Sequence, residues 1–379
     1  MRNPPEYYAK VGYEDHGYVS PELSSSNEYP DYIEAEVKES VRSIQEHQGF
    51  GTFSFGFMTD LHYATSYNHY IRMKRNINSY REITKRAHVD RLMLGGDYTN
   101  EGCKEYKSDC FRELRAHLSG VDYYPVNGNH DDGTIWDGNY ICAETSTNFL
   151  SHEDMYNLFY NHLPSLGAEF DAENDGLYYV INDRVNKVRY VCLDSNDVPY
   201  IYDEKGKLKY GGQHLFAMSQ AQLDWLCNTA LSFDEEGWSV MFFAHSHLPE
   251  GREDGNLYKN LYCMREIITA FKNREKCELT YGEGDFERHV NADFSEGIGA
   301  DVIGCFIGDH HVDRVDTYRG VVYVLTANSV NYYVGAPTQV PRSDGDKREL
   351  LYDIVTVDKK QRKLFITRVG AGEDRVVDY

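Results

Sequence analysis

The sequence has no apolar run long enough to span a membrane. Its opening stretch, MRNPPEYYAKVGYEDHG, lacks the apolar core of a secretory signal. The 8 cysteines stand singly, without a C-x-x-C pair, which argues against a zinc ribbon. Cys192 and Cys305 lie within apolar runs, where a free cysteine behaves as a small hydrophobic side chain. We therefore expect a cytoplasmic protein without a membrane partner.

Basic residues are scarce relative to acidic ones. Lysine and arginine total 39, aspartate and glutamate total 61, and the formal net charge is −22. Such a surface repels nucleic-acid backbones and anionic membranes, so we expect no nucleic-acid partner. A small phosphorylated substrate remains compatible with this charge, because bound metal ions can invert the local field.

Two common functional loops are also missing. The sequence contains no G-x-x-x-x-G-K-[ST] phosphate loop and no G-x-S-x-G nucleophile elbow. The glycines of GFGTFSFG (49–56) precede a strand-like run and do not link a strand to a helix, so they do not form a dinucleotide loop. Any catalytic chemistry must therefore come from other residues.

Hydrophobic periodicity alternates between helix and strand along the first third of the chain. Residues 31–47 place four apolar side chains, from Ile33 to Ile44, on one helical face. Strand-like runs follow at 52–60, 89–97 and 121–130, separated by helical spacing at 77–87 and 107–118. This order predicts βαβ units with parallel strands.

The remainder predicts further strands and one insertion. GLYYVIND and VRYVCLD are expected to pair antiparallel, and a helix (SQAQLDWLCNTAL) and a strand (SVMFFAH) follow. Residues 250–300 are charged and surround a helix near 257–272, so we expect an excursion from the core. No linker is clear enough to split the chain. We divide it into an arm and helix, 1–50, and one domain, 51–379, that includes the excursion.

Five apolar runs end in side chains that bind metals. The run ends read TDLH (59–62), GGD (95–97), VNGNHD (126–131), AHSH (244–247) and GDHH (308–311), and they hold 6 of the 15 histidines. Carboxyl ends of parallel strands converge, and oxygen and nitrogen donors suit divalent metals. Taken singly, each aspartate or histidine is better explained as a turn or cap residue. Together, the ordered run ends predict a metal centre.

Local details of two run ends support this prediction. Alternation along an extended strand is expected to turn Asp60 and His62 to the same side, so that both can bind one ion. A glycine before Asp97 and another before Asn129 are expected to let the backbone approach the site closely.

In order, the run ends resemble the motifs of the calcineurin-like metallophosphoesterases: D-x-H, G-D, G-N-H-[DE], a histidine after a strand, and G-H-x-H. The resemblance spans about residues 52–330. It implies an α/β fold of four layers, an αββα sandwich of two mixed β-sheets flanked by helices. It also implies two divalent metal ions, for which manganese, iron, zinc and magnesium are all candidates.

The resemblance carries over residue by residue. It implies that Asp60, His62 and His311 hold the first ion and that Asp97 bridges both ions. Asn129 and a histidine of AHSH would then hold the second ion.

Two positions of the second ion leave alternatives open. Strand alignment selects His245 as the histidine of AHSH, whereas the family's H-x-P pattern selects His247; we favour His245. Asp309 stands where the family normally has the first histidine of G-H-x-H. A carboxylate there would either favour harder ions or weaken the second site.

The implied reaction is hydrolysis of phosphate mono- or diesters of small molecules by a hydroxide that bridges the two ions. His130 would donate a proton to the leaving oxygen, and Asn100 would orient His130 by a hydrogen bond. Glu101 replaces the arginine that protein phosphatases of the family use, so we expect no phosphoprotein phosphatase of that type. The alternative, which Asp309 favours, is a metal-binding scaffold or interaction protein with little catalysis. The oligomeric state stays open.

Overall fold

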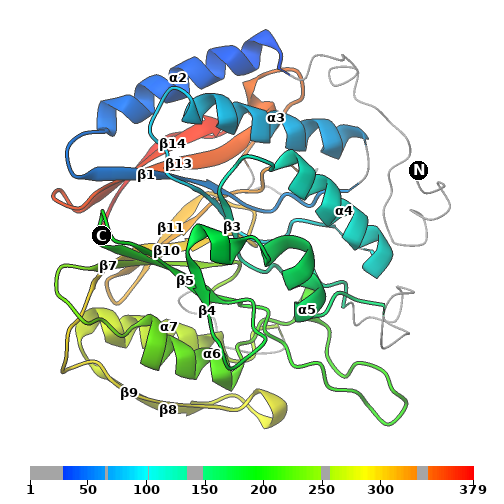
Figure 1. Ribbon diagram of the computed structural model, residues 1–379, viewed down its shortest axis with the longest axis vertical. Coiled ribbons are helices and arrows are strands. Elements are labelled where there is room, and N and C mark those ends of the chain that lie inside the picture. Colours follow the sequence, from blue (N-terminus) through cyan, green and yellow to red (C-terminus); the bar gives the residue numbers. More distant parts are fainter. Residues whose placement is uncertain (1–28, 65–66, 101, 135–147, 249–256, 331–339) are drawn as a thin grey trace.

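The computed structural model describes residues 29–64, 67–100, 102–134, 148–248, 257–330 and 340–379. The predicted N-terminal arm, 1–30, therefore lies almost wholly outside the described residues. In the described part, two large mixed sheets pack face to face and helices cover both outer faces (Figure 1). The predicted four-layer αββα fold is confirmed.

The first sheet has six strands in the order β15-β14-β13-β1-β2-β3. Parallel pairing joins β1 to β2 and β2 to β3, as the βαβ pattern predicted, while β13 pairs antiparallel with β1. The carboxyl ends of three consecutive strands thus meet at one edge. The bounds are β1 (Thr52–Met58), β2 (Leu92–Leu94), β3 (Tyr123–Pro125), β13 (Leu351–Asp358), β14 (Lys363–Gly370) and β15 (Arg375–Asp378).

The second sheet has seven strands in the order β11-β12-β10-β7-β6-β5-β4. Its centre is parallel, because β7 pairs in parallel with β6 and β10, and β10 pairs in parallel with β12. The predicted antiparallel pairing of β5 with β6 is confirmed. The bounds are β4 (Ala168–Phe170), β5 (Tyr179–Asp183), β6 (Val188–Cys192), β7 (Ser239–Ala244), β10 (Asp301–Ile307), β11 (Arg314–Tyr318) and β12 (Val321–Leu325).

Aromatic side chains fill the space between the sheets. Phe55 of β1 meets Tyr190, Phe243 and Phe306 edge-on, at centroid distances of 6.2, 5.6 and 5.1 Å. Each such pair contributes about 0.5–1.5 kcal/mol beyond its buried area. Because β1 belongs to one sheet and its three partners belong to the other, this cluster fixes the strand ends of both sheets relative to one another.

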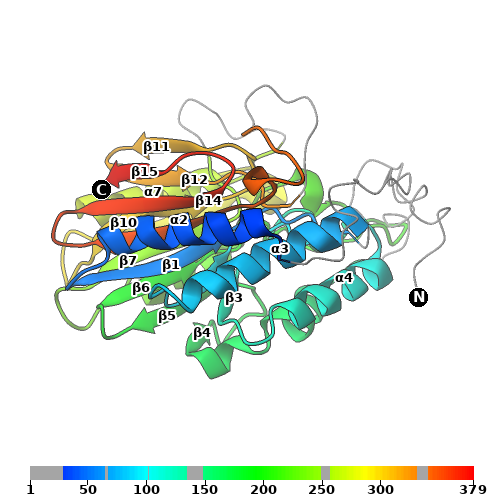
Figure 2. The ribbon, with the colours of Figure 1, turned by 90° about the horizontal axis from the view of Figure 1, so that it is seen from above.

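Helices α2 (Asp31–His47) and α3 (Tyr67–Thr84) lie side by side over the first sheet, with α4 (Lys104–His117) beside them (Figure 2). Ile33, Val37 and Ile44 of α2 are buried in the same core as β1. The helix of the predicted N-terminal segment therefore packs into the main core, and the division at residue 50 stays a prediction. On the other side, α6 (Gln220–Trp225), the π-helical turn η5 (Leu226–Ala230) and α7 (Leu261–Asn273) cover the second sheet.

The described part of the predicted excursion contains α7 and a hairpin. The hairpin consists of β8 (Lys276–Tyr281), the turn η6 (Gly284–Phe286) and β9 (Arg288–Asp293), and it lies outside α6 and α7 (Figure 1). Cys277 and Val290 point inward and join the cluster that holds Ile267 and Phe271 of α7. The hairpin thus adds a partial outer layer that the sequence pattern did not predict.

Helix α3 begins at Tyr67, well before the helical spacing that was predicted at 77–87. Its first half buries polar side chains, which hides the apolar period: Arg75 is fully buried and pairs with Glu349 at 2.9 Å. The remaining short elements are α5 (His152–Met155), η2 (Tyr156–Tyr160), η3 (Leu163–Leu166), η4 (Gly212–His214) and η7 (Lys347–Glu349).

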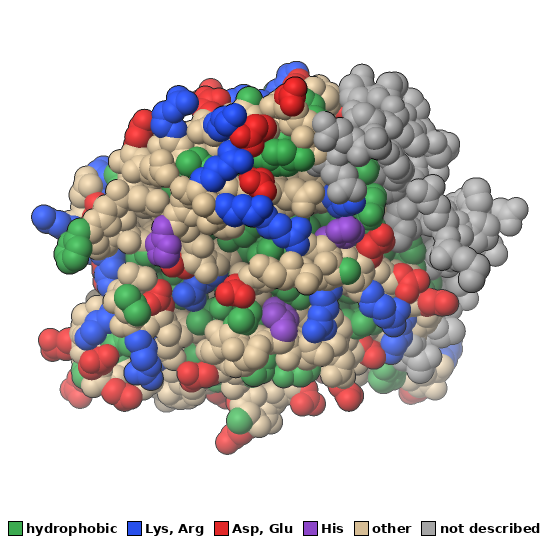
Figure 3. All heavy atoms as spheres, turned by 45° about the horizontal axis from the view of Figure 1, so that its top comes forward, with side chains coloured by type: hydrophobic (Ala, Val, Ile, Leu, Met, Phe, Trp, Pro, Cys, Tyr) green, Lys and Arg blue, Asp and Glu red, His purple; other side chains and the backbone are tan. Residues whose placement is uncertain are grey.

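Charged side chains of both signs are interspersed over the face that bears α2 and α3 (Figure 3). Within the described ranges, no helix combines the length and the apolar character needed to cross a membrane. Cys103 is disulfide-bonded, whereas the other described cysteines are free. Because disulfides persist mainly in oxidising compartments, the cytoplasmic location stays a prediction.

Candidate metal centre

Within each sheet, backbone hydrogen bonds tie the ends of neighbouring strands together. In the first sheet, Asp60 N–H donates to Gly96 O at 3.0 Å and His62 N–H donates to Asp97 O at 2.8 Å. In the second sheet, Gly308 N–H donates to His245 O at 3.0 Å. These bonds hold four of the five predicted run ends in register at the carboxyl edges of the sheets.

Three of these run ends, TDLH, GGD and GDHH, contain non-glycine residues with left-handed backbone. The φ angles are 52° at Asp60, 42° at His62, 53° at Asp97, 59° at Asp309 and 53° at His311. Residues other than glycine rarely adopt the left-handed region. Those that do are concentrated at functional sites. We expected an extended strand to turn Asp60 and His62 to the same side. That reason is wrong, because β1 ends at Met58, before both residues. The two side chains converge through a left-handed turn.

Four of the predicted ligands form one cluster. Asp60, His62, Asp97 and His311 each offer one ligand atom within 4.8 Å of the others. His311 Nε2 lies 3.0 Å from Asp60 Oδ1 and 3.0 Å from His62 Nε2, and His62 Nε2 lies 3.4 Å from Asp97 Oδ2. The three residues from the first sheet are buried, while the His311 side chain keeps 14% of its surface exposed.

A second group of donors faces the other oxygen of Asp97. His245 Nε2 lies 3.3 Å from Asp97 Oδ1 and 2.9 Å from Asn129 Oδ1. The Asn129 amide donates through Nδ2 to Gln213 O at 2.8 Å, which leaves its Oδ1 facing the site. Asp97 therefore stands between two donor groups, with one oxygen toward each.

The donor set fits divalent cations. His245 Nδ1 lies 2.7 Å from Gly95 O, so the proton of neutral His245 sits on Nδ1 and the lone pair of Nε2 faces two oxygen acceptors. The Nε2 atoms of His62 and His311 likewise face one another and the carboxylates. Only shared protons or cations can hold so many lone pairs together. A histidine that binds a metal through one ring nitrogen commonly donates its other ring N–H to a carbonyl, and His245 Nδ1 has such a carbonyl partner in Gly95.

The local charges produce opposing pKa shifts. Burial lowers the pKa of His62 well below its usual value, which favours the neutral imidazole that binds metals. Burial also acts to lower the pKa of His245, but Asp97 outweighs it and raises that pKa well above its usual value. Asp60 likewise raises the pKa of His311 against the effect of burial. These raised pKa values favour protons on His245 and His311 when no cation is bound.

The structure separates the two candidate histidines of AHSH. His245 faces Asp97 and Asn129, as favoured from strand alignment. His247 instead points to Asp316, at 3.5 Å from its Oδ2, and stacks on the ring of Tyr323 at 5.0 Å.

Asp309 lies at the edge of the centre. Its N–H is 3.2 Å from both carboxylate oxygens of Asp60, and its carboxylate accepts a hydrogen bond of 2.6 Å from Ser246 Oγ. Asp309 is not a member of the described four-residue cluster. Its role as a ligand of the second ion stays a prediction.

His130 lies beside the cluster on its more open side. Its ring meets that of His62 edge-on at 4.9 Å, its Nε2 is 4.0 Å from Asp97 Oδ2, and its side chain is 15% exposed. No hydrogen bond joins the side chains of Asn100 and His130 in the described part of the chain. A long hydrogen bond, 3.5 Å, joins Gln213 Nε2 to His130 Nδ1. Gln213 therefore occupies the place that we had expected for Asn100.

Comparison with known families decides the relationship. A family model described as calcineurin-like phosphoesterase matches residues 53–313, which is more than half of the chain and includes all five run ends. The chain belongs to the calcineurin-like phosphoesterase family. A search among curated proteins finds no match. Glu101, where the expected arginine is replaced, lies outside the described residues.

Solved structures similar to this phosphoesterase have low identity and low TM-scores. A predicted phosphoesterase of Streptococcus pneumoniae is 10% identical over 87% of this chain and 100% of its own, with a TM-score of 0.32. GAP50 of Plasmodium, described as the anchor in the inner membrane complex, is 10% identical over 86% and 90%, with a TM-score of 0.42. A putative 5′-nucleotidase from Staphylococcus aureus is 10% identical over 86% and 54%, with a TM-score of 0.34. Likenesses this weak say nothing about the function of this chain.

Asp131 is a buried residue of the phosphoesterase motif whose role the sequence did not reveal. Its Oδ2 accepts from the N–H groups of Asp97 and Gly128, each at 3.0 Å. Its Oδ1 accepts from Tyr98 at 2.8 Å and Thr99 at 3.1 Å. One carboxylate thus fixes the loops after β2 and β3 together. Glycine is required here, because a Cβ at Gly128 would lie 2.0 Å from Asp97 N.

Lys107 of α4 is a second support that was missed. Its ammonium is buried, donates to Thr99 Oγ1 at 3.0 Å, and also donates to the carbonyls of Asn100 and His130. The lysine therefore ties the loop after β2 to the loop after β3, as Asp131 does. Its only sequence signal is a lysine in the first turn of a helix, which is ordinarily a solvated position.

A buried ion-pair network holds the last ligand loop of the phosphoesterase. Arg368 of β14 donates to Asp313 at 2.6 and 2.8 Å and to Asp353 at 2.8 Å, and its side chain is 1% exposed. Asp313 follows His311 by two residues and also accepts from Ala327 N–H at 3.0 Å. The loop that carries His311 is thus anchored to the first sheet.

Proposed function

We propose that this phosphoesterase hydrolyses phosphate mono- or diesters of small molecules with water, using two divalent cations. The observation that carries the proposal is the position of Asp97. Its carboxylate meets His62 through one oxygen and His245 through the other, with 3.4 and 3.3 Å separations, as a bridging ligand must. A net charge of −22 argues against polynucleotide substrates.

The two donor groups define which residues would hold each ion. Asp60, His62 and His311 would hold the first, and Asn129 and His245 the second, with Asp97 shared. Asp309 is the remaining candidate for the second ion. When bound, such cations neutralise charge on phosphoryl oxygens and lower the pKa of water, so that a strong nucleophile is available near neutral pH.

His130 is proposed as the proton donor to the leaving oxygen. If Gln213 donates to Nδ1, neutral His130 carries its proton on Nε2, the nitrogen that faces Asp97. A proton on that atom can reach an ester oxygen lying over the cluster, and the His130 side chain is itself 15% exposed. Proton donation matters most when the leaving group is a poor one, such as an alkoxide.

The test compares chelator-treated protein with protein refilled with Mn²⁺, Fe²⁺, Zn²⁺ or Mg²⁺. Turnover of phenyl phosphate and of bis(4-nitrophenyl) phosphate is followed in each sample. We expect metal-dependent turnover of at least one ester class. Asp97→Asn should lower kcat/KM by about a thousandfold or more, because both ions lose a shared charge.

His130→Ala separates acid catalysis from metal binding. We expect the variant to retain its metal and to lose about a hundredfold in kcat with an alkyl phosphate, but much less with 4-nitrophenyl phosphate. His88→Ala is the matched control, because that histidine is 81% exposed and precedes β2, whereas Asp97 follows the opposite end of that strand. Bound metal without turnover of any ester would support the scaffold alternative instead.

A further inference from the structure

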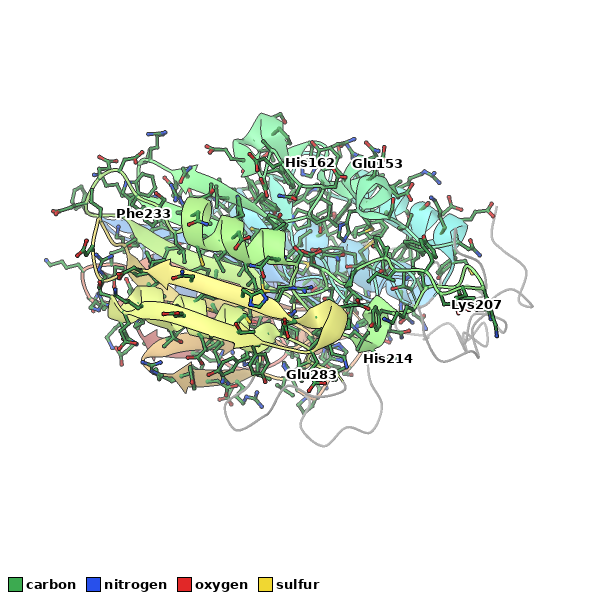
Figure 4. The ribbon with its side chains drawn as sticks, turned by 90° about the horizontal axis from the view of Figure 1, so that it is seen from below. Glu153, His162, Lys207, His214, Phe233 and Glu283 are labelled. Carbon is green, nitrogen blue, oxygen red and sulfur yellow. The ribbon has the colours of Figure 1, made fainter. Side chains whose placement is uncertain are left out.

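A groove of about 610 Å³ opens next to η4. It is lined by Lys209, Tyr210, His214, Leu215, Leu257 and Lys259, together with Gly211. Its volume falls within the range of small-molecule sites. Figure 4 shows His214 at this end of the molecule, next to the turn of the β8–β9 hairpin that carries Glu283.

The groove is joined to the candidate metal centre through Gln213. This residue lies between groove residues Gly211 and His214, its carbonyl accepts from Asn129, and its amide contacts His130. The same segment is fixed to the loop after β3, since Gly212 N–H donates to Thr134 Oγ1 at 2.6 Å. If the phosphoryl group of a substrate lies over the cluster, its ester oxygen is next to His130 and Gln213. The rest of the substrate can then extend past Gln213 into the groove.

The opposite wall of the groove is a short extended segment. Phe216 N–H donates to Leu257 O and Lys259 N–H donates to Phe216 O, both at 2.9 Å. Tyr258, between them, is buried and stacks on Phe216 at 5.3 Å. Alternation along the segment therefore turns Leu257 and Lys259 to the other side, toward the groove. One wall thus offers an apolar surface and an ammonium group next to each other.

The charge of the groove contrasts with that of the whole chain. Among the described residues, none of its lining side chains is acidic. Lys209 is paired with Asp285 of the hairpin turn. The Lys259 ammonium lies 5.7 Å from the centre of the Phe286 ring, and no carboxylate in the described ranges pairs with it. Lys259 is therefore a cation available to a ligand on a protein of net charge −22.

We propose that this groove binds the alcohol portion of the substrate and selects esters in which that portion carries a second anionic group. Lys259 recognises the anion, and Tyr210, Leu215 and Leu257 pack against an apolar or aromatic body between the anion and the phosphoryl group. This proposal rests on the proposed phosphoesterase function, because it assigns the part of the substrate that is released as the alcohol.

The experiment uses pairs of aryl and arylalkyl phosphates of increasing length that end in a carboxylate or in the carboxamide of nearly the same shape. We expect kcat/KM to favour the carboxylate by about three- to tenfold at the length that reaches the groove, as for a partly exposed charge-assisted hydrogen bond. The preference should weaken at high salt. Phenyl phosphate, which carries no second anionic group, reports the basal activity.

Substitutions separate the groove from the metal centre. Lys259→Gln should abolish the carboxylate preference while phenyl phosphate turnover stays unchanged, and Lys259→Arg should retain the preference. Lys85→Gln, which removes a 65%-exposed lysine in the turn that follows α3 on the other side of the fold, is the charge-matched control. Equal kcat/KM for carboxylate and carboxamide at every length, or a preference that survives Lys259→Gln, would overturn the groove proposal and leave the phosphoesterase function standing.

Binding is also measured without turnover. Calorimetry with the phosphate-free alcohols, one ending in carboxylate and one in carboxamide, tests the groove independently. We expect tighter binding of the carboxylate to the wild type but not to Lys259→Gln. If no ester is hydrolysed, the proposed function fails while this measurement still decides the groove, and equal affinities would refute it.

Discussion

Asp131 offers the sharpest test of how the ligand loops are held. Its two carboxylate oxygens accept four backbone N–H groups, from Asp97, Tyr98, Thr99 and Gly128, over 2.8–3.1 Å. In Asp131→Asn, the amide oxygen can keep two of these bonds. The amide NH₂ group would then face the other two N–H groups, donor against donor.

The size of the effect follows from those lost bonds. A hydrogen bond to a charged group is worth about 1.5–3 kcal/mol, so losing two costs about 3–6 kcal/mol of unfolding free energy. Burial, followed by the Asp97 charge, raises the pKa of Asp131 to about 7. The measurement is therefore made at pH 8, where the carboxylate is ionised. Because Asp97 N–H is one of the freed donors, the loop carrying the bridging ligand should also lose its fixed position.

Urea unfolding of the metal-free protein and calorimetric Mn²⁺ binding are measured side by side for Asp131→Asn and for Asp122→Asn, an exposed carboxylate in the same region. We expect a loss of about 3–6 kcal/mol and at least tenfold weaker Mn²⁺ binding for Asp131→Asn, and changes within about 0.5 kcal/mol for Asp122→Asn. If Asp131→Asn matched the wild type in both measurements, the reasoning that this carboxylate fixes the loops would be refuted.

Three further predictions concern protons and supports. Metal binding near pH 7 should release protons from His245 and His311, because Asp97 and Asp60 raise the pKa values of these histidines. Metal affinity should therefore rise with pH, about tenfold per pH unit for each proton displaced. Calorimetry in buffers of different ionisation enthalpy counts the released protons. Arg368→Met should destabilise the fold by about 2–4 kcal/mol, because Asp313 loses its arginine partner and the buried Asp353 is left with Arg375 alone, as urea unfolding would show. Lys107→Met should cost about 2–4 kcal/mol by the same assay, since three acceptors lose their donor.

Matched controls keep these predictions specific. Lys104→Met removes a 40%-exposed lysine one turn earlier in α4, and Arg362→Met removes a 48%-exposed arginine paired with Asp301; each should cost less than about 1 kcal/mol. Equal losses for the buried and exposed members of a pair would contradict the assigned supporting roles. Metal affinity independent of pH between 6 and 8 would contradict proton displacement.

The order of the run ends predicted most of the centre, because residues after parallel strands must meet at one edge of a sheet. Asp60, His62 and Asp97 are found together for that reason, and the face-to-face packing of the two sheets brings His311, which follows β10, to them. The left-handed backbone at these residues was not predictable, since aspartate and histidine adopt it only in a minority of cases and the packed loops impose it here.

The supports were invisible for a different reason. Gln213 reaches His130 from a segment more than eighty positions away, and its neighbours in sequence give no sign of a role. Lys107 is an ordinary helix lysine until α4 is placed against the loops that it supports. The β8–β9 hairpin was likewise missed, because its outward residues are polar or charged and a charged residue, Arg288, shares the buried positions with Cys277 and Val290.

Anomalous diffraction from crystals soaked in Mn²⁺ tests the metal centre most directly. We predict one peak within about 2.0–2.4 Å of ligand atoms of Asp60, His62, Asp97 and His311, and a second on the side of Asp97 that faces Asn129 and His245. Saturated crystals with no anomalous peak between these side chains would contradict the metal centre and the function built on it.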